Sequence, residues 1–175
     1  MKLKIYILTL FLIACNRPLD RYEYKKMLDQ SQLLQHLETD SFSYSMTLLP
    51  PKFKALQSDF QNQKDFDNLV KDFSSDWHFH LLIEDKFPDR LYKSSNSMYY
   101  LSDFQQEFSL NSADSVSYFH HEAGHFKGRE SFLFGIPNKN QASISILIRT
   151  HMNDANLSFD FPTDEIIRFN QIDIK

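Results

Sequence analysis

The chain has 175 residues, a length that suits one domain able to bury about two-thirds of the surface its unfolded form exposes. It carries 23 acidic and 19 basic residues, a net charge of −4, and has no basic run. That balance argues against nucleic acid as a partner, because phosphate contacts dominate the affinity of nucleic-acid-binding proteins.

The first fifteen residues predict export and lipidation. An apolar run from Ile5 to Ala14 follows two lysines, and it is shorter than the roughly 20 residues needed to span a bilayer. The run ends in Leu12-Ile13-Ala14-Cys15, which resembles the lipobox of bacterial lipoproteins. We expect residues 1–14 to be a signal peptide and residues 15–20 to be a short tether.

Cys15 is the only cysteine, so the chain cannot form an internal disulfide, and its place at the end of the apolar run marks it as the acylated residue. The lipid bilayer is then a direct partner, held through more than one acyl chain. Lipoproteins that are retained in the inner membrane typically have Asp directly after the acylated cysteine, whereas this chain has Asn16. By that resemblance, we expect a lipid-anchored protein of the cell envelope at the outer membrane.

The first half of the expected domain, residues 21–175, alternates helical and strand patterns. Residues 20–37 show helical spacing with a break at Ser31, and Phe42 to Leu48 alternate apolar and polar residues as a strand does. Helical spacing returns from Phe53 to Phe73.

The second half is rich in strand patterns. We expect strands at 76–84, 130–136, 142–150 and 157–161, the last two forming a hairpin, and short helices at 102–108 and after Thr163. The fold class is therefore α+β, a mostly antiparallel sheet with helices packed on one face.

The stretch from Tyr118 to Phe132 contains His121-Glu122-Ala-Gly-His125, the spelling of a zinc-protease helix. As a helix over 115–127, it would place both histidines on one face as zinc ligands, with Glu122 as the general base. As a strand followed by a glycine turn, it would point His121 and Glu122 to opposite faces. Ser131 stands where a third histidine ligand would be. A zinc-dependent metallopeptidase is therefore the alternative, and the leading expectation has no catalytic residue and no cofactor.

His78 and His80 share one face of an expected strand, with Glu84 following. The simpler interpretation is a solvent-facing pair of histidines. A weaker alternative is a metal bound by His78 and His80, with or without a histidine of the 120–125 group.

Several short segments resemble uncharacterised small lipoproteins of Bacteroidota-type bacteria. The matching residues are Tyr44, Leu49-Pro50-Pro51, Ala55-Leu56, then His120-His121-Glu122, Gly128 and Ser131-Phe132-Leu133-Phe134. Ala123 stands where that group generally has a basic residue, and His125 has no counterpart in it. The resemblance implies a strand–turn–strand at the motif and brings no activity with it.

The leading functional expectation is a membrane-anchored domain that binds or scaffolds something at the cell envelope. An envelope protein partner would dock on a sheet edge or on the aromatic surface around Met98, Tyr99 and Tyr100, although core packing explains that trio more simply.

Overall fold

The computed structural model describes residues 19–87, 104, 108–110, 116–122, 128–139, 143–150 and 155–174. Within these residues it contains eight strands and four helices, so the α+β class expected from the sequence is confirmed. In the part of the chain that is described, no helix has the length and apolar character needed to cross a membrane.

The larger sheet has five strands, and every neighbouring pair is antiparallel. In spatial order they are β1 (Leu34–Glu38), β2 (Phe42–Leu49), β3 (Asp76–Asp85), β6 (Arg129–Pro137) and β5 (Tyr118–Glu122). Residues of β3 therefore lie beside residues of β2 and β6 that are distant in sequence.

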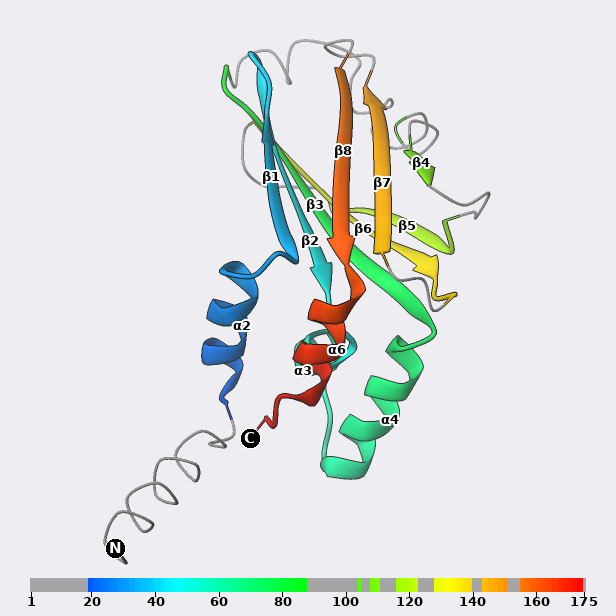
Figure 1. Ribbon diagram of the computed structural model, residues 1–175. Coiled ribbons are helices and arrows are strands. Elements are labelled where there is room, and N and C mark those ends of the chain that lie inside the picture. Colours follow the sequence, from blue (N-terminus) through cyan, green and yellow to red (C-terminus); the bar gives the residue numbers. More distant parts are fainter. Residues whose placement is uncertain are drawn as a thin grey trace, which may run out of the picture.

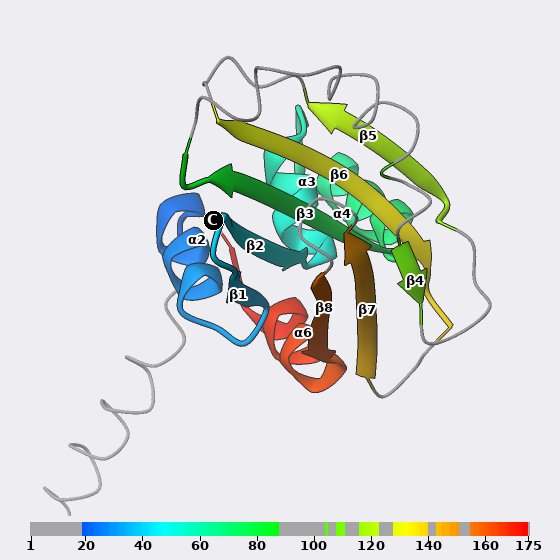
Figure 2. The same ribbon diagram turned by 90° about the horizontal axis from the view of Figure 1, so that it is seen from above.

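The smaller sheet has three antiparallel strands, β4 (Phe108–Leu110), β7 (Ser143–Thr150) and β8 (Ala155–Pro162). β7 and β8 form the expected hairpin, with Ile146 opposite Phe159. They lie on one side of the larger sheet (Figure 2).

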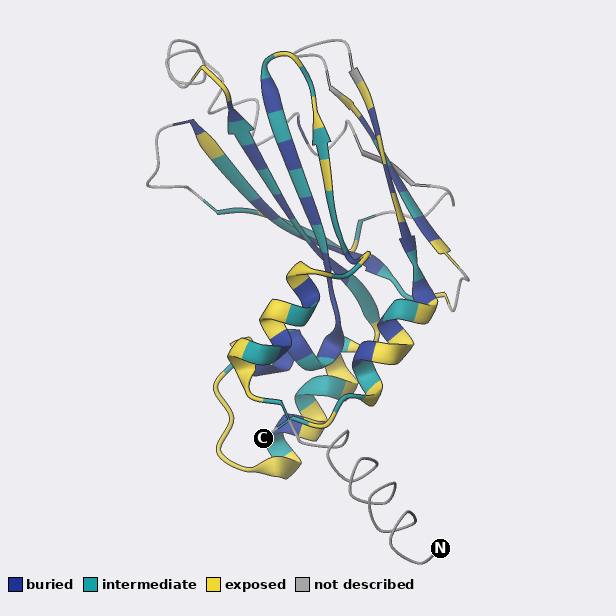
Figure 3. Cartoon of the chain, turned by 60° about the vertical axis from the view of Figure 1, so that its left-hand side comes forward, coloured by how far each residue is buried: buried dark blue, intermediate teal, exposed yellow. Residues whose placement is uncertain are grey.

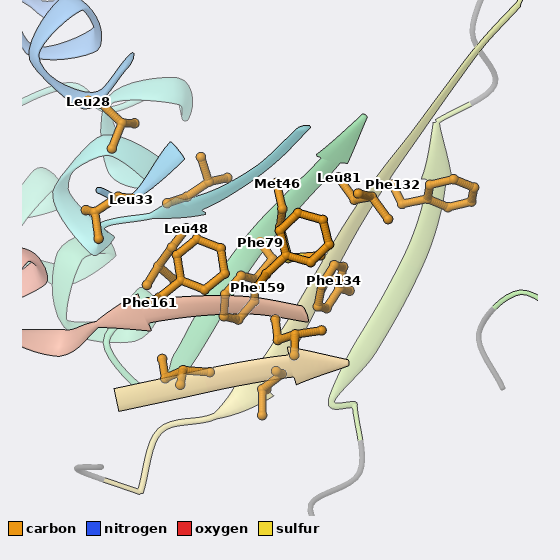
Figure 4. Close-up of a cluster of buried hydrophobic side chains, with 14 of the residues drawn as sticks. Leu28, Leu33, Met46, Leu48, Phe79, Leu81, Phe132, Phe134, Phe159 and Phe161 are labelled. Carbon is orange, nitrogen blue, oxygen red and sulfur yellow. The ribbon is translucent and has the colours of Figure 1, made fainter. Parts of the chain in front are cut away.

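The inner faces of the two sheets form a core rich in phenylalanine (Figure 4). Phe79 on β3 lies with its ring centroid 5.1 Å from that of Phe134 on β6 and 5.4 Å from that of Phe161 on β8. The buried and less buried residues alternate along the strands, as their sequence patterns predict (Figure 3). The opposite face of the larger sheet, called the outer face below, points away from the smaller sheet.

The four described helices gather toward one end of the strands (Figure 1). They are α2 (Arg21–Asp29), α3 (Pro51–Gln57), α4 (Gln63–Phe73) and α6 (Thr163–Gln171). Their ends follow local sequence: Asp20 and Glu23 form a capping box at α2, Asn62 caps α4, and Pro51 occupies the first turn of α3.

Two sequence-based expectations need correction. The helical spacing predicted over 20–37 holds only as far as Asp29, because residues 34–38 form the edge strand β1. The leucines there pack as a strand against β2, with Leu37 opposite Tyr44. Of the helical segment expected at 102–108, most lies outside the described residues, and Phe108 begins strand β4.

Candidate functional site

A cleft of about 430 Å³ lies between the outer face of the larger sheet and the helices α2 and α3. Four strands supply its floor and two helices its wall, so no single segment of the sequence contains it. Its lining residues are Lys25, Leu28, Asp29, Thr47, Leu49, Phe53, Gln57, His80, Glu122 and Leu133.

His80, Ser131 and Glu122 form a hydrogen-bonded chain at the sheet floor of the cleft. The Nε2 atom of His80 lies 2.8 Å from the Ser131 hydroxyl, which in turn donates to Glu122 Oε2 at 2.7 Å. His80 Nε2 and Glu122 Oε2 are 3.8 Å apart. The strand register brings these three residues together. Ser131 on β6 lies opposite Glu122 of β5 and opposite Leu82 of β3, and His80 is two residues before Leu82 on the same face of β3.

The protonation of His80 follows from its surroundings. Burial lowers the pKa of the imidazole below its ordinary value, Lys25 and Lys54 lower it further, and Glu122 opposes the shift. His80 is therefore neutral at neutral pH. Because the single Ser131 proton is donated to Glu122, His80 donates its Nε2 proton to Ser131, which leaves Nδ1 as an unprotonated acceptor.

This chain is not a nucleophilic triad. A triad needs the carboxylate on the far nitrogen of the histidine, so that the histidine can take the serine proton. Here the Ser131 hydroxyl donates its hydrogen bond directly to Glu122 and accepts one from His80, so His80 is not placed to take the serine proton. The arrangement suits binding of a ligand that donates hydrogen bonds.

His78 lies on the same sheet face but is not the solvent-facing residue that the sequence suggested. Its exposed fraction is 5%, and its ring is fixed by the Tyr118 hydroxyl at 2.7 Å and by the Phe73 carbonyl at 2.9 Å. Burial lowers the pKa of His78 and raises that of Tyr118 to about 12. Gly135 leaves room for the Tyr118 ring, since a Cβ there would lie 2.7 Å from its Cδ1 atom.

Lys54 lies over the two rings that surround His78. Its ammonium is 5.8 Å from the ring centroid of Phe73 and 5.7 Å from that of Tyr118. Burial lowers the pKa of Lys54, and the nearby charge of Glu122 partly offsets that effect. Lys54 therefore interacts with Glu122, a residue of the cleft, although Lys54 itself does not line the cleft.

The zinc-helix prediction for 115–127 is wrong where the structure describes it, because residues 118–122 form strand β5. His121 turns to the inner face, where it stacks on Phe132 and lies 2.5 Å from Glu130. Glu122 turns to the outer face and the cleft. Residues of a strand alternate in this way, whereas a zinc helix needs ligands one turn apart on one face.

The backbone of Gly128 is consistent with the strand interpretation. Gly128 has φ of 80°, a conformation that glycine adopts at little cost, and it lies just before β6. His125, the second proposed zinc ligand, lies outside the described residues, as do Cys15 and Met98, Tyr99 and Tyr100. Among the described side chains, no group of three or more His, Cys, Asp or Glu could hold a metal ion.

Comparison of the chain with protein-family models, with curated proteins and with solved structures finds no match. The function of the candidate site is therefore inferred from its geometry.

His80 and Glu122 stand out in the sequence, but in separate motifs. Ser131 stands out only as a departure from a zinc motif, and no sequence pattern indicated Lys25 or the apolar lining as part of a site. The available signal for Ser131 was a polar residue on the outer face of an apolar strand. That signal shows which face the hydroxyl occupies, but it does not show which strands lie beside it.

Proposed function

We propose that this protein is a lipid-anchored binding domain of the cell envelope, attached through acylated Cys15 and placed at the outer membrane. The lipobox-like sequence ending at Cys15 and the Asn16 that follows support the anchor and its location. The likeness of the Leu49-Pro50-Pro51 segment to small Bacteroidota-type lipoproteins supports the same compartment.

The entry of the chain into the domain fits such an anchor. Leu19 is paired with Ile174 in a parallel bridge, and its amide donates to the Asp173 carbonyl at 2.9 Å. Four extended residues reach at most about 14 Å, so an acylated Cys15 would hold Leu19 within that distance of the bilayer. The helical end of the domain would face the membrane, and the free ends of the sheets would point away from it (Figure 1).

The cleft over the His80–Ser131–Glu122 chain is the observation that supports binding as the molecular activity. It combines hydrogen-bonding groups on its floor with apolar side chains on its walls, the composition of ligand sites in general. Its polar chain is not arranged for nucleophilic attack, which favours binding over catalysis.

Membrane fractionation of cells that produce the protein tests the anchor. Wild-type protein should stay with outer membranes at high salt, and Cys15→Ser should leave the protein unacylated, as metabolic labelling with a fatty acid would show. Asn16→Asp is the matched control, because it should keep the lipid while shifting the protein toward the inner membrane. Fatty-acid labelling that persists in Cys15→Ser would refute the anchor.

A further inference from the structure

We propose that the ligand of this cleft is a small protonated amine that carries an apolar group. The inference rests on the proposed binding function and deepens it by naming the chemical class of the ligand. It follows from the hydrogen-bonding capacity, the charge and the shape of the cleft.

The polar floor offers acceptors. Glu122 Oε2 accepts a hydrogen bond from the Ser131 hydroxyl, and its Oε1 atom has no hydrogen-bond partner among the described residues. His80 uses Nε2 toward Ser131, so Nδ1 is its second, unprotonated nitrogen. A carboxylate oxygen and an imidazole nitrogen match the several N–H donors of an ammonium group.

The charge inside the cleft favours a cation. Of the four ionisable lining residues, Lys25 and Asp29 form an ion pair at 2.8 Å, and His80 is neutral at neutral pH. Glu122 is left as the lining charge without an oppositely charged lining partner. Lys54 opposes a cation only from outside the lining, where its ammonium rests over the Phe73 and Tyr118 rings.

The apolar residues that line the cleft favour a ligand with an apolar body behind the ammonium. Leu28, Leu49, Phe53 and Leu133 approach the cleft from two helices and two strands. A volume of about 430 Å³ lies within the usual range for small-molecule sites. Contact with these side chains would remove apolar ligand surface from water, while Glu122 would fix the orientation of the charged end.

Titration calorimetry of the lipidated protein in detergent tests this inference with three probes that share a phenylethyl group. They are phenethylamine, the neutral 2-phenylethanol and the anionic 3-phenylpropionate. We expect saturable one-to-one binding of the amine, at least tenfold weaker binding of the other two, and at least tenfold weaker amine binding by Glu122→Gln. The variant in the same detergent also corrects for partition of the amine into micelles.

Glu84→Gln is the matched control. Glu84 lies on the outer face of β3 like His80, forms an ion pair with Arg129, and is not a lining residue, so its variant should bind the amine as wild type does. Thr47→Phe is a second cleft variant, which should weaken amine binding by filling the floor without changing charge. Circular dichroism establishes that each variant is folded before its binding is measured.

Each remaining outcome overturns a distinct part of the proposal. Equal binding of amine and alcohol would refute the role of Glu122. Preference for the carboxylate probe would refute the amine class and leave the cleft as a binding site. Failure of all three probes would refute the inference without touching the lipid anchor, which fractionation tests separately.

Discussion

At the scale of single residues, His78 shows how burial converts a titratable side chain into a structural one. Its two ring nitrogens contact the Tyr118 hydroxyl and the Phe73 carbonyl, and its ring meets the Phe73 ring edge-on at 5.5 Å. A charged imidazole would lose hydration at this position, and Lys54 also disfavours the charge. The neutral form is therefore part of the packing between α4 and the sheet.

This burial predicts that stability falls in mild acid. The folded pKa of His78 lies below the ordinary value of 6.5, and that of His80 is shifted in the same direction. The unfolded chain therefore takes up protons first as the pH drops. The free energy of unfolding should decrease below about pH 6.5 and level off once the folded imidazoles are protonated too.

Urea denaturation between pH 7.5 and pH 5 measures this loss, and NMR titration of the imidazoles measures the pKa values directly. His78→Gln should show a smaller decrease than wild type, because one titrating group is gone while an amide can still meet Tyr118. His36→Gln on exposed β1 is the control and should behave as wild type does. A His78 pKa above 6.5 would contradict the prediction.

At the scale of elements, the edge strand β1 joins the two sheets through a side chain. The Gln35 amide donates to the Asp160 carbonyl, and the Asp160 amide donates back to Gln35 Oε1 at 3.1 Å. The side-chain amide thus takes the place of a neighbouring backbone at β8, which is an edge strand of the smaller sheet. It covers part of an edge that could otherwise pair with another chain.

Gln35→Met tests this link. A thioether side chain of similar length cannot donate to the Asp160 carbonyl and is at best a weak acceptor for the Asp160 amide, so we expect a loss of about 0.5–1.5 kcal/mol of stability. Hydrogen exchange should speed up at the Asp160 amide more than at amides in the middle of β7. Gln57→Met, at an exposed position of α3, is the control and should leave exchange at Asp160 unchanged. Equal exchange at Asp160 in wild type and Gln35→Met would mean that the Gln35 amide does not protect this edge.

Strands with a strict period of two were predictable from the sequence, and β1 was not. Phe42 to Leu48 and Phe132 to Ile136 each alternate, and both lie in strands as expected. The leucines before Glu38 have spacing that a helix shares, and among the described strands β1 has only β2 beside it. Its conformation is set by pairing with β2, a long-range contact that local spacing does not contain.

At the scale of the whole molecule, the two sheets share one core. Phe79 contacts rings from both, and the buried residues of β2, β3, β6, β7 and β8 form a single cluster. The domain should therefore unfold as one cooperative unit.

Phe79→Ala tests the shared core. Removing a fully buried phenyl ring should cost about 3–5 kcal/mol. Fluorescence of Trp77 reports on the larger sheet, and amide exchange at Ile146 reports on the smaller one. Both signals should change with the same midpoint in urea. Phe60→Ala should cost less, because Phe60 is 43% exposed. Separate midpoints in Phe79→Ala would show that the sheets are independent.

The site was harder to predict than the fold, for a reason that also belongs to this scale. His80 and Glu122 are far apart in the chain, and they meet only because β6 lies between β3 and β5. The sequence carries the alternation that puts both on the outer face, but it does not carry the strand order. The local sequence around His121 therefore suggested a metal site. In the structure, strand alternation places Glu122 on the outer face, and the strand order places it beside His80 in the cleft.

The pairing of Leu19 with Asp173 and Ile174 also determines how the domain responds to mechanical tension. A pull on the tether would load one backbone hydrogen bond and the first turn of α2, and the sheets would initially carry none of it. Residues 19–23 could peel away as far as Tyr24, whose side chain is fully buried. Each peeled helical residue lengthens by about 2 Å, so the tether would stretch by several ångströms while the core stays closed.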